Sequence, residues 1–243
     1  MFPPEIILGS GSPRRRELLQ LLGLPFQVIL PTEEVDETPL PHELPAELVQ
    51  RLSRLKNEAV ATTLASQDHF AHEVLILTAD TTVALDRFIL NKPQDDMEAR
   101  EMLTSLREQP HLVYTSMTVS RWQRQTLEII TLLDTNKVWM RDYSEAEIEA
   151  YIASGDPFDK AGAYAIQHAT FAPVARFEGC FASIMGLPLA QLVSHLQTLG
   201  FEVPPVQPRC QAYINGTCCQ VGWKKSANRV WKKQNFLKFQ VWM

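Results

Sequence analysis

The sequence predicts an α/β protein with one main domain, on three observations. Short apolar runs that end in small residues alternate with segments whose apolar residues recur at helical spacing, which is typical of strands interleaved with helices. The length of 243 residues suits one large domain, or one domain of about 200 residues with an appendage. Hydrophobic residues at 45% and charged residues at 21% are ordinary for a soluble globular protein, so a sizeable core can form without disulfides.

Each expected element has its own local signal. Residues 5–10 form an apolar run that predicts a buried strand, and Ser12-Pro13 predicts an N-cap and a first helical position, with a stop at Gly23. The acidic, proline-bearing stretch 32–45 predicts a loop, and the apolar run 74–85 predicts a central strand. The other expected elements are helices over 46–65, 95–108, 144–155 and 189–199, and strands over 112–122, 127–140, 161–167 and 174–185. The helix at 144 starts with a capping-box sequence.

Residues 204–243 differ in kind from the rest of the chain. They hold seven basic residues and no acidic one, whereas the remainder has 16 basic against 28 acidic residues, a net charge of −12. Three of the five tryptophans also lie there, and interleaved basic and aromatic residues occur in some segments that bind single-stranded nucleic acid. The alternative, which we favour, is an accessory extension that is disordered or packs locally. We therefore expect a domain over 1–203 and an extension over 204–243, with no nucleic-acid partner.

Several protein classes are not supported by the sequence. No run approaches the roughly 20 apolar residues that span a bilayer, and the N-terminus lacks the basic and apolar regions of a secretory signal, so we expect a cytoplasmic protein without a membrane partner. The four cysteines, Cys180, Cys210, Cys218 and Cys219, match neither a simple disulfide framework nor a four-ligand zinc spacing. We expect them to be cytosolic thiols.

The turn between the first strand and the first helix predicts a site for phosphate. In Gly9-Ser10-Gly11-Ser12-Pro13, a strand gives way to a helix, and backbone N–H groups and the positive end of the helix dipole point to one place. Arg14, Arg15 and Arg16 follow directly, and guanidinium groups bind phosphate oxygens in pairs. The Walker A pattern is absent. The alternative is an ordinary capped helix with a solvated basic face.

A carboxylate within an apolar strand is the second candidate. Asp80 interrupts the run 74–85, and a buried carboxylate must be paired, neutral or bound to metal. Beside a triphosphate it could hold Mg²⁺ or accept a proton from water, whereas the alternative is an aspartate that caps a turn at a strand end. The acidic stretch 33–37 could add a carboxylate to a metal site, although most of its members are expected to be solvated.

Two further polar segments are weaker candidates. Lys92 precedes a proline and places a point charge near the strand ends, although a lone lysine is usually solvated. Asp159 and Lys160 form an adjacent acid–base couple, after which Tyr164 offers a stacking face and Gln167 an amide that can read a base edge. The alternative for this segment is a polar turn that leads into a strand.

Taken in order, these segments closely resemble the Maf family of nucleotide pyrophosphatases. The resemblance covers roughly residues 5 to 200, and the ordered set is far more specific than any one motif. The matching pieces are Ser10–Arg15 with Glu17-Leu18-Leu19, Lys56, Ala79-Asp80-Thr81, Lys92-Pro93, Glu98–Leu103, Tyr114-Thr115, Asp159–Tyr164 with Ile166-Gln167, and Gly186–Leu189. Residues 204–243 lie outside it.

The resemblance implies a fold, a reaction and a set of site residues. The fold would be a mixed, strongly twisted sheet flanked by helices, like that of the inosine triphosphate pyrophosphatases, with a central cleft between two lobes. The reaction would be hydrolysis of a nucleoside triphosphate to its monophosphate and pyrophosphate, with Mg²⁺ or Mn²⁺. Asp80 would be the catalytic proton acceptor or a metal ligand, and Glu34 a second metal ligand. Phosphate binding would involve Ser10, Arg14, Arg15, Lys56, Lys92 and Lys160, and substrate choice Arg15, Thr81 and Gln167.

The segment 161–167 (AGAYAIQ) resembles the branch of the family that acts on dTTP and UTP. Ala165 and His168 stand where that branch usually has glycine, and each added Cβ restricts the backbone beside the expected base reader. His168 is either a contact to the base or a surface histidine. The implied partners are a nucleoside triphosphate and a second copy of the chain. The alternatives are a pyrophosphatase for modified nucleotides and a non-catalytic regulator of septum formation, the effect that gave the family its name.

Overall fold

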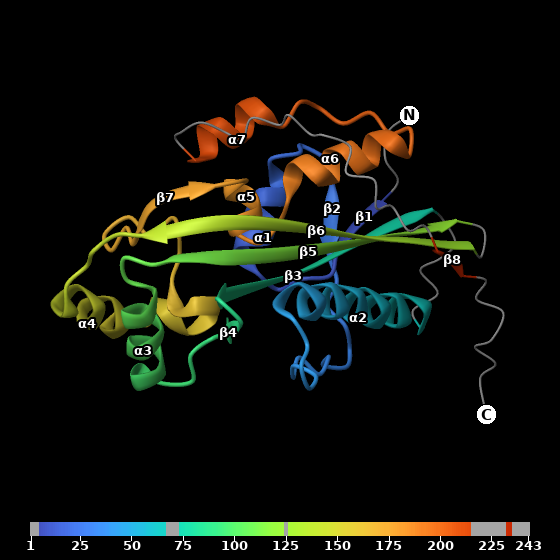
Figure 1. Cartoon of the computed structure of the whole chain (residues 1–243). Coiled ribbons are helices and arrows are strands. Elements are labelled where there is room, and N and C mark those ends of the chain that lie inside the picture. The colour runs from blue at the N-terminus through green and yellow to red at the C-terminus, as the bar shows by residue number, and fades with distance from the viewer. Residues whose placement is uncertain (1–4, 67–72, 124–125, 215–231, 235–243) are drawn as a thin grey trace.

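A computed structural model describes residues 5–66, 73–123, 126–214 and 232–234. In these ranges, eight strands form one mixed sheet, and helices cover both of its faces (Figure 1). The predicted α/β class and the mixed sheet flanked by helices are confirmed. No helix in the described ranges is long and apolar enough to cross a bilayer.

The sheet is mixed because its first strand is parallel to both of its neighbours. The strand order is β2-β1-β3-β5-β6-β7, with β4 paired to β3 and β8 to β6. β1 runs parallel to β2 and β3, and every other pair is antiparallel. The strands are β1 (Glu5–Leu8), β2 (Phe26–Val28), β3 (Val74–Leu85), β4 (Phe88–Leu90), β5 (Pro110–Gln123), β6 (Thr126–Met140), β7 (Val174–Glu178) and β8 (Lys232–Gln234).

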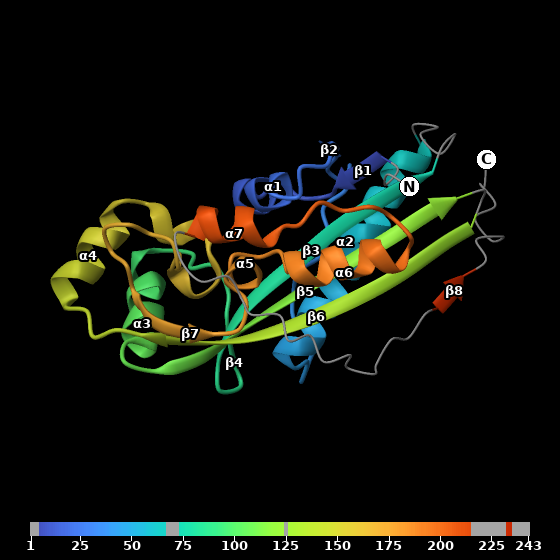
Figure 2. The same cartoon turned by 90° about the horizontal axis from the view of Figure 1, so that it is seen from above.

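The helices divide between the two faces and one end of the sheet. α1, α5, α6 and α7 lie over one face, α2 lies against the other, and α3 and α4 gather at one end (Figures 1 and 2). The helices are α1 (Pro13–Gln20), α2 (Pro45–Ser66), α3 (Asp96–Leu106), α4 (Glu145–Ala153), α5 (Phe181–Ile184), α6 (Leu189–Thr198) and α7 (Gln207–Ile214). Two short 3₁₀ helices, η2 (Asp156–Asp159) and η3 (Ala161–Ala163), follow α4.

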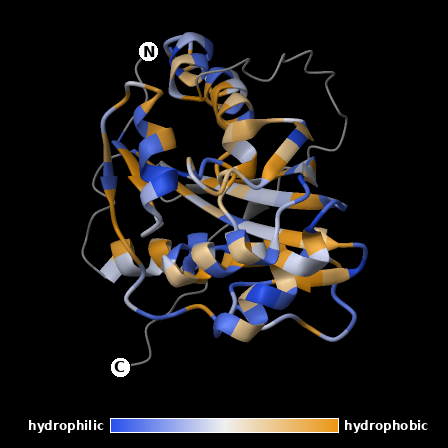
Figure 3. Cartoon of the chain, turned by 90° about the vertical axis from the view of Figure 1, so that its left-hand side faces the viewer, coloured by the Kyte–Doolittle hydropathy of each residue, from blue (hydrophilic) through white to orange (hydrophobic). Residues whose placement is uncertain are grey.

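The pattern of buried residues explains why these segments take these places. In β1, Ile6 and Leu8 pack under α1 and α6, whereas Ile7 between them packs against α2. A strand alternates its side chains between two faces, so a strand covered on both faces has a continuous apolar sequence. On the helix ribbons, hydrophobic and hydrophilic residues alternate instead (Figure 3), because each helix buries only one face. A third cluster surrounds α3, α4 and η3 at the far end of the sheet.

One predicted strand is wrong, and another is confirmed only in its first part. The segment 161–167 is not a strand but the turn η3 and an irregular stretch, in which Gly162 and Ala163 have φ values of +70° and +59° that no strand accommodates. The expected strand 174–185 ends at Glu178. There Gly179, at φ +120°, redirects the chain into the short helix α5. The sequence of both segments is apolar enough for a strand, and the backbone turns override that pattern.

The first part of the C-terminal extension packs on the domain. Val206 and Cys210 of the α7 region are buried in the cluster under α1 and α6. Arg209 Nη1 donates to the carbonyl of Leu21 at the C-terminal end of α1 (3.2 Å), a helix that has no basic residue of its own in its last turn. Tyr213 Oη donates to Glu17 of α1 (2.6 Å). Apart from the backbone of β8, the basic and tryptophan-bearing positions after residue 214 lie outside the described residues, as do Cys218 and Cys219.

The predicted capping box of α4 is confirmed and leads to a prediction. Ser144 Oγ accepts from the backbone N–H of Glu147, and Glu147 accepts in return from the backbone N–H of Ser144 at 2.8 Å. These bonds, and above all the one from Arg141, lower the pKa of Glu147 from 4.5 to about 2. Because the folded pKa is depressed, this stabilisation is present above pH 4.5 and is lost as the pH falls toward 2. Thermal unfolding should therefore show a lower midpoint for Glu147→Gln than for wild type at pH 7, and the difference between the two midpoints should shrink toward pH 3. A difference that stays constant with pH would contradict this.

Candidate active site

A pocket of about 370 Å³ lies beside the middle of β3. Its walls come from α1, α2 and the loop before it, β3, the segment after β4, and the stretch from η2 to Gln167. The volume lies within the usual range for small-molecule sites. The strand β3 contributes Asp80–Val83 to the lining, between residues of α1 and α2 and residues of the stretch from η2 to Gln167.

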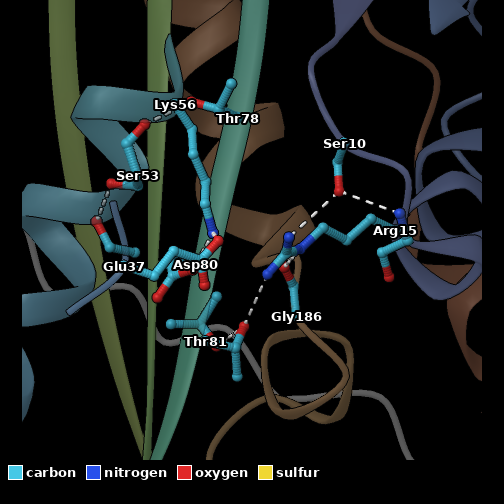
Figure 4. A network of polar contacts seen from close by, with 12 residues as sticks. Ser10, Arg15, Glu37, Ser53, Lys56, Thr78, Asp80, Thr81 and Gly186 are labelled. Carbon is cyan, nitrogen blue, oxygen red and sulfur yellow. Dashed lines mark hydrogen bonds and ion pairs between the residues drawn. The ribbon is translucent and has the colours of Figure 1, made fainter. Parts of the chain in front are cut away.

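Asp80 and Lys56 form the charged centre of the pocket. Asp80 lies in the middle of β3 with 7% of its surface exposed, and its Oδ1 is 2.6 Å from Lys56 Nζ. The same ammonium is 2.7 Å from Glu37 Oε1, in the loop before α2 (Figure 4). One cation thus holds two carboxylates that would otherwise repel each other. Asp80, a buried carboxylate within an apolar strand, is therefore paired with a basic residue, as its burial requires.

The position of Lys56 is fixed by hydrogen bonds between α2 and the sheet. One turn before it, the carbonyl of Ser53 accepts from Thr78 Oγ1 on β3 at 2.7 Å. One residue after it, Asn57 Nδ2 donates to the carbonyls of Ile76 and Thr118, at 3.1 and 3.3 Å. Both groups are buried, so these bonds cannot be exchanged for water without cost. They hold α2 in register with β3, so that Lys56 meets Asp80.

Arg15 is oriented by three neutral acceptors. Its Nε donates to the carbonyl of Gly186 (3.0 Å), Nη1 to Ser10 Oγ (3.2 Å) and Nη2 to Thr81 Oγ1 (3.4 Å), as Figure 4 shows. Desolvation lowers the pKa of Arg15, but a guanidinium remains charged in proteins. A guanidinium has five N–H donors, so two remain, one on each terminal nitrogen. These two donors form a fork that suits an anionic oxygen or a pair of carbonyl oxygens.

The other basic residues differ in how available they are. Lys92 lines the pocket and is exposed, and Arg14 lies 3.5 Å from Asp159 Oδ2 across its rim. Lys160 is 8% exposed, and its ammonium meets the carbonyl of Asp156 (2.5 Å), Asp159 Oδ1 (2.5 Å) and Asp156 Oδ1 (3.0 Å). These contacts can occupy all three N–H groups of the lysine. A phosphate contact from Lys160 would therefore have to replace one of them.

The structure brings most of the sequence-predicted site residues to one place. Those that line the pocket are Arg14, Arg15, Lys56, Asp80, Thr81, Lys92, Lys160 and Gln167. Ser10 joins them through Arg15. Glu34, by contrast, is exposed and is not among the lining residues, whereas Glu37 is. Sequence reasoning missed Glu37 because the acidic stretch 33–37 has no period that singles out one carboxylate.

Two aromatic residues near Gln167 have structural contacts that the sequence did not reveal. Tyr164 is 6% exposed, and its hydroxyl is 2.7 Å from Nε2 of buried His111. Burial raises the pKa of Tyr164 and lowers that of His111 to about 4, so the pair is neutral. Little of the tyrosine ring is left as the stacking face we expected. His168 is not a pocket-lining residue, because its Nδ1 accepts from the backbone N–H of Phe171 (2.9 Å) and its ring packs on Tyr151.

Comparison with known proteins identifies the family of the chain. Residues 5–199 match the family described as Maf-like protein. Curated relatives named dTTP/UTP pyrophosphatase include those of Nitrosomonas europaea (43% identical, covering 82% of this chain and 96% of the relative), Pelotomaculum thermopropionicum (40%, covering 82% and 98%) and Neisseria meningitidis (40%, covering 82% and 96%). The family match covers β1 to β7, α1 to α6 and the pocket-lining residues, and it stops before α7 and β8. The chain therefore belongs to the Maf family.

Proposed function

We propose that this chain hydrolyses dTTP and UTP to the nucleoside monophosphate and pyrophosphate. The observation that carries the proposal is the arrangement of charges in one pocket, where the Lys56–Asp80–Glu37 cluster is joined by the donor fork of Arg15 and by Lys92. Carboxylates activate water and hold cations, whereas guanidinium and ammonium groups bind phosphate oxygens. The relatives' names agree with this chemistry.

The proposed reaction is a displacement at the α-phosphorus. A water oxygen forms a bond to that phosphorus while its bond to the oxygen that bridges to the β-phosphate breaks, and the electron pair leaves with pyrophosphate. Asp80 accepts the proton of the water, through the carboxylate whose Oδ1 faces Lys56. Arg14, Arg15, Lys56 and Lys92 bind the phosphate oxygens and stabilise the charge that develops on the leaving group. Ser10 acts through Arg15, and Lys160 supports the site and contacts phosphate if one of its bonds to Asp156 or Asp159 is exchanged.

The carboxylates also fit a divalent cation. Within the described ranges no group of three or more His, Cys, Asp or Glu side chains is placed to hold a metal ion. Two carboxylates do lie close together in the pocket, because Asp80 and Glu37 both contact the ammonium of Lys56. Mg²⁺ is characteristically held by one or two carboxylates together with substrate phosphates and water, and Mn²⁺ accepts the same ligands. When bound, such an ion would polarise the α-phosphoryl group and neutralise triphosphate charge. Glu34 remains a sequence-based prediction for this role.

The opposite wall is proposed to select the base. Gln167 is exposed into the pocket and its amide offers both a donor and an acceptor, which suits the edge of thymine or uracil. Ala165 forms part of the same wall, whereas His168 supports the turn behind it. Cytoplasmic localisation and a homodimer are further expectations of the resemblance.

A substrate panel tests the proposal. Pyrophosphate release should be measured for dTTP, UTP, CTP, 7-methyl-GTP and dITP with Mg²⁺ or Mn²⁺, and we expect dTTP and UTP to be preferred. Gln167→Leu should lower kcat/KM for both by roughly tenfold, the net effect of one hydrogen bond, while Gln197→Leu on the exposed side of α6 should match wild type. Turnover of another nucleotide alone would overturn the base assignment. Orthophosphate release, or no turnover by folded protein, would overturn the reaction.

A further inference from the structure

A buried threonine beneath the pocket is connected to Arg15 by a chain of hydrogen bonds. Thr115 lies on β5, directly opposite Thr81 of β3, has no exposed surface and is not a pocket-lining residue. Its Oγ1 donates to the carbonyl of Ser183 at 2.8 Å and is 3.1 Å from Thr81 Oγ1. Thr81 Oγ1 in turn accepts from Arg15 Nη2 at 3.4 Å. Thr115 is thus two hydrogen bonds away from the guanidinium.

The direction of each bond in this chain follows from what each group can do. A carbonyl oxygen only accepts, so the single hydroxyl proton of Thr115 is used on Ser183. Thr115 Oγ1 can then only accept from Thr81, which must donate its own proton. Arg15 can only donate, and Thr81 Oγ1, which has given its own proton to Thr115, accepts the hydrogen bond from Arg15 Nη2. The proton order therefore runs in one direction, from Arg15 through Thr81 and Thr115 to the backbone.

The short turn from Ser183 to Gly186 supplies the carbonyls at both ends of this series of hydrogen bonds. The carbonyl of Gly186, two residues after α5, accepts directly from Arg15 Nε, while the carbonyl of Ser183 within α5 is the end of the threonine chain. Asn136 of β6 holds the turn, because its Oδ1 accepts from the backbone N–H of Cys180 (2.6 Å) and its Nδ2 donates to Ser183 Oγ (3.0 Å). Two carbonyls of one anchored turn thus orient the same guanidinium.

We propose that Thr115 is a positioning residue that fixes the orientation of Arg15 by setting the direction of the Thr81 hydroxyl. Thr81 then has no proton to donate to a nucleotide, and it influences substrate choice through Arg15. Gly186 has φ +115°, and a Cβ there would lie 3.3 Å from both Arg15 Nε and Thr81 Oγ1. The guanidinium is therefore closely packed against the backbone on that side. The role in substrate choice rests on the proposed function, whereas the orientation of Arg15 does not.

The kinetic test uses isosteric substitutions. Thr115→Val should raise KM for dTTP roughly tenfold, the effect of one hydrogen bond to a charged group, with a much smaller change in kcat. Thr115→Ser, which restores the hydroxyl, should return KM to near the wild-type value. Ser120→Ala is the control, since Ser120 is equally buried on β5 and its hydroxyl has no hydrogen-bond partner among the described residues. Thr81→Val combined with Thr115→Val should be no worse than Thr81→Val alone.

A second readout does not depend on turnover. The Nε–H of Arg15, assigned in a nitrogen-15 spectrum by its loss in Arg15→Lys, should exchange slowly with solvent in the wild type and in Ser120→Ala. It should shift and exchange faster in Thr115→Val. If no nucleotide is hydrolysed but this spectral result holds, the proposed function fails and the role of Thr115 stands. An unchanged Arg15 signal, a wild-type KM in Thr115→Val, or additive effects in the double variant would overturn the role of Thr115.

Discussion

Asp80→Asn is expected to reduce kcat for dTTP by on the order of 10³-fold or more. The change removes the proposed proton acceptor and the negative charge that would help to hold a divalent cation. Asparagine has the same shape as aspartate and can still fill its place on β3. The fold should therefore survive, and the thermal midpoint should stay close to that of wild type. Stopped pyrophosphate-release assays with dTTP and Mg²⁺ measure the first effect, and calorimetry the second.

Asp86→Asn provides the matched control for this change. Asp86 lies in the exposed turn between β3 and β4 with φ +53°, a conformation that asparagine adopts as readily as aspartate. The same chemical substitution should therefore leave kcat unchanged there. Activity like that of wild type in Asp80→Asn would remove Asp80 from the proposed mechanism and direct attention to Glu37 as the proton acceptor.

Lys56→Met is the second change with a large expected effect. Methionine approximates the stem of lysine but removes the ammonium that binds both Asp80 and Glu37. The two carboxylates are then left to repel each other, and the phosphate oxygens lose one cation. We expect kcat/KM for dTTP to fall by about 10² to 10³-fold, as for other preorganised groups that stabilise transition-state charge.

Replacing an exposed basic residue of the same helix by methionine separates this effect from a general one. Arg54→Met, two residues earlier on α2 and exposed, should retain the kcat/KM of wild type. If Lys56→Met loses activity only through KM and is rescued by raising the concentration of divalent cation, then Lys56 organises the carboxylates but does not stabilise the leaving group. Full activity without that rescue would exclude both roles.

Local sequence signals predicted most of the elements, and the exceptions have a common cause. The strand that holds Asp80, the long helix that carries Lys56 and the capping box at Ser144 depend on nearby residues and on apolar period. The segments around Gly162 and Gly179 instead take their shape from positive φ values and from contacts distant in sequence, such as that between Asn136 and Cys180. An apolar pattern cannot represent such contacts.

The candidate site shows the same division. Its basic residues and Asp80 could be named from motifs, because each occurs in a segment with its own signature. The choice of Glu37 over its acidic neighbours depends on where the loop meets Lys56, which is a three-dimensional fact. In the same way, the burial of Tyr164 against His111 depends on a partner 53 residues away. The division of the chain after residue 203 stays a prediction. In the structure, α7, which belongs to the predicted extension, contacts α1.

The long central strands limit how the pocket can admit its ligand. The pairing of β3 with β5 runs unbroken from Val74 opposite Trp122 to Ala84 opposite Leu112, and Asp80 lies within it. β5 and β6 pair continuously over the same stretch. A hinge between the lobes would have to bend three hydrogen-bonded strands at once, so clamshell closure of the kind seen in proteins with flexible interdomain linkers is disfavoured. The paired strands therefore fix the width of the pocket floor, and any widening that admits a nucleotide is left to the segments at the rim, among them the loop that carries Glu37.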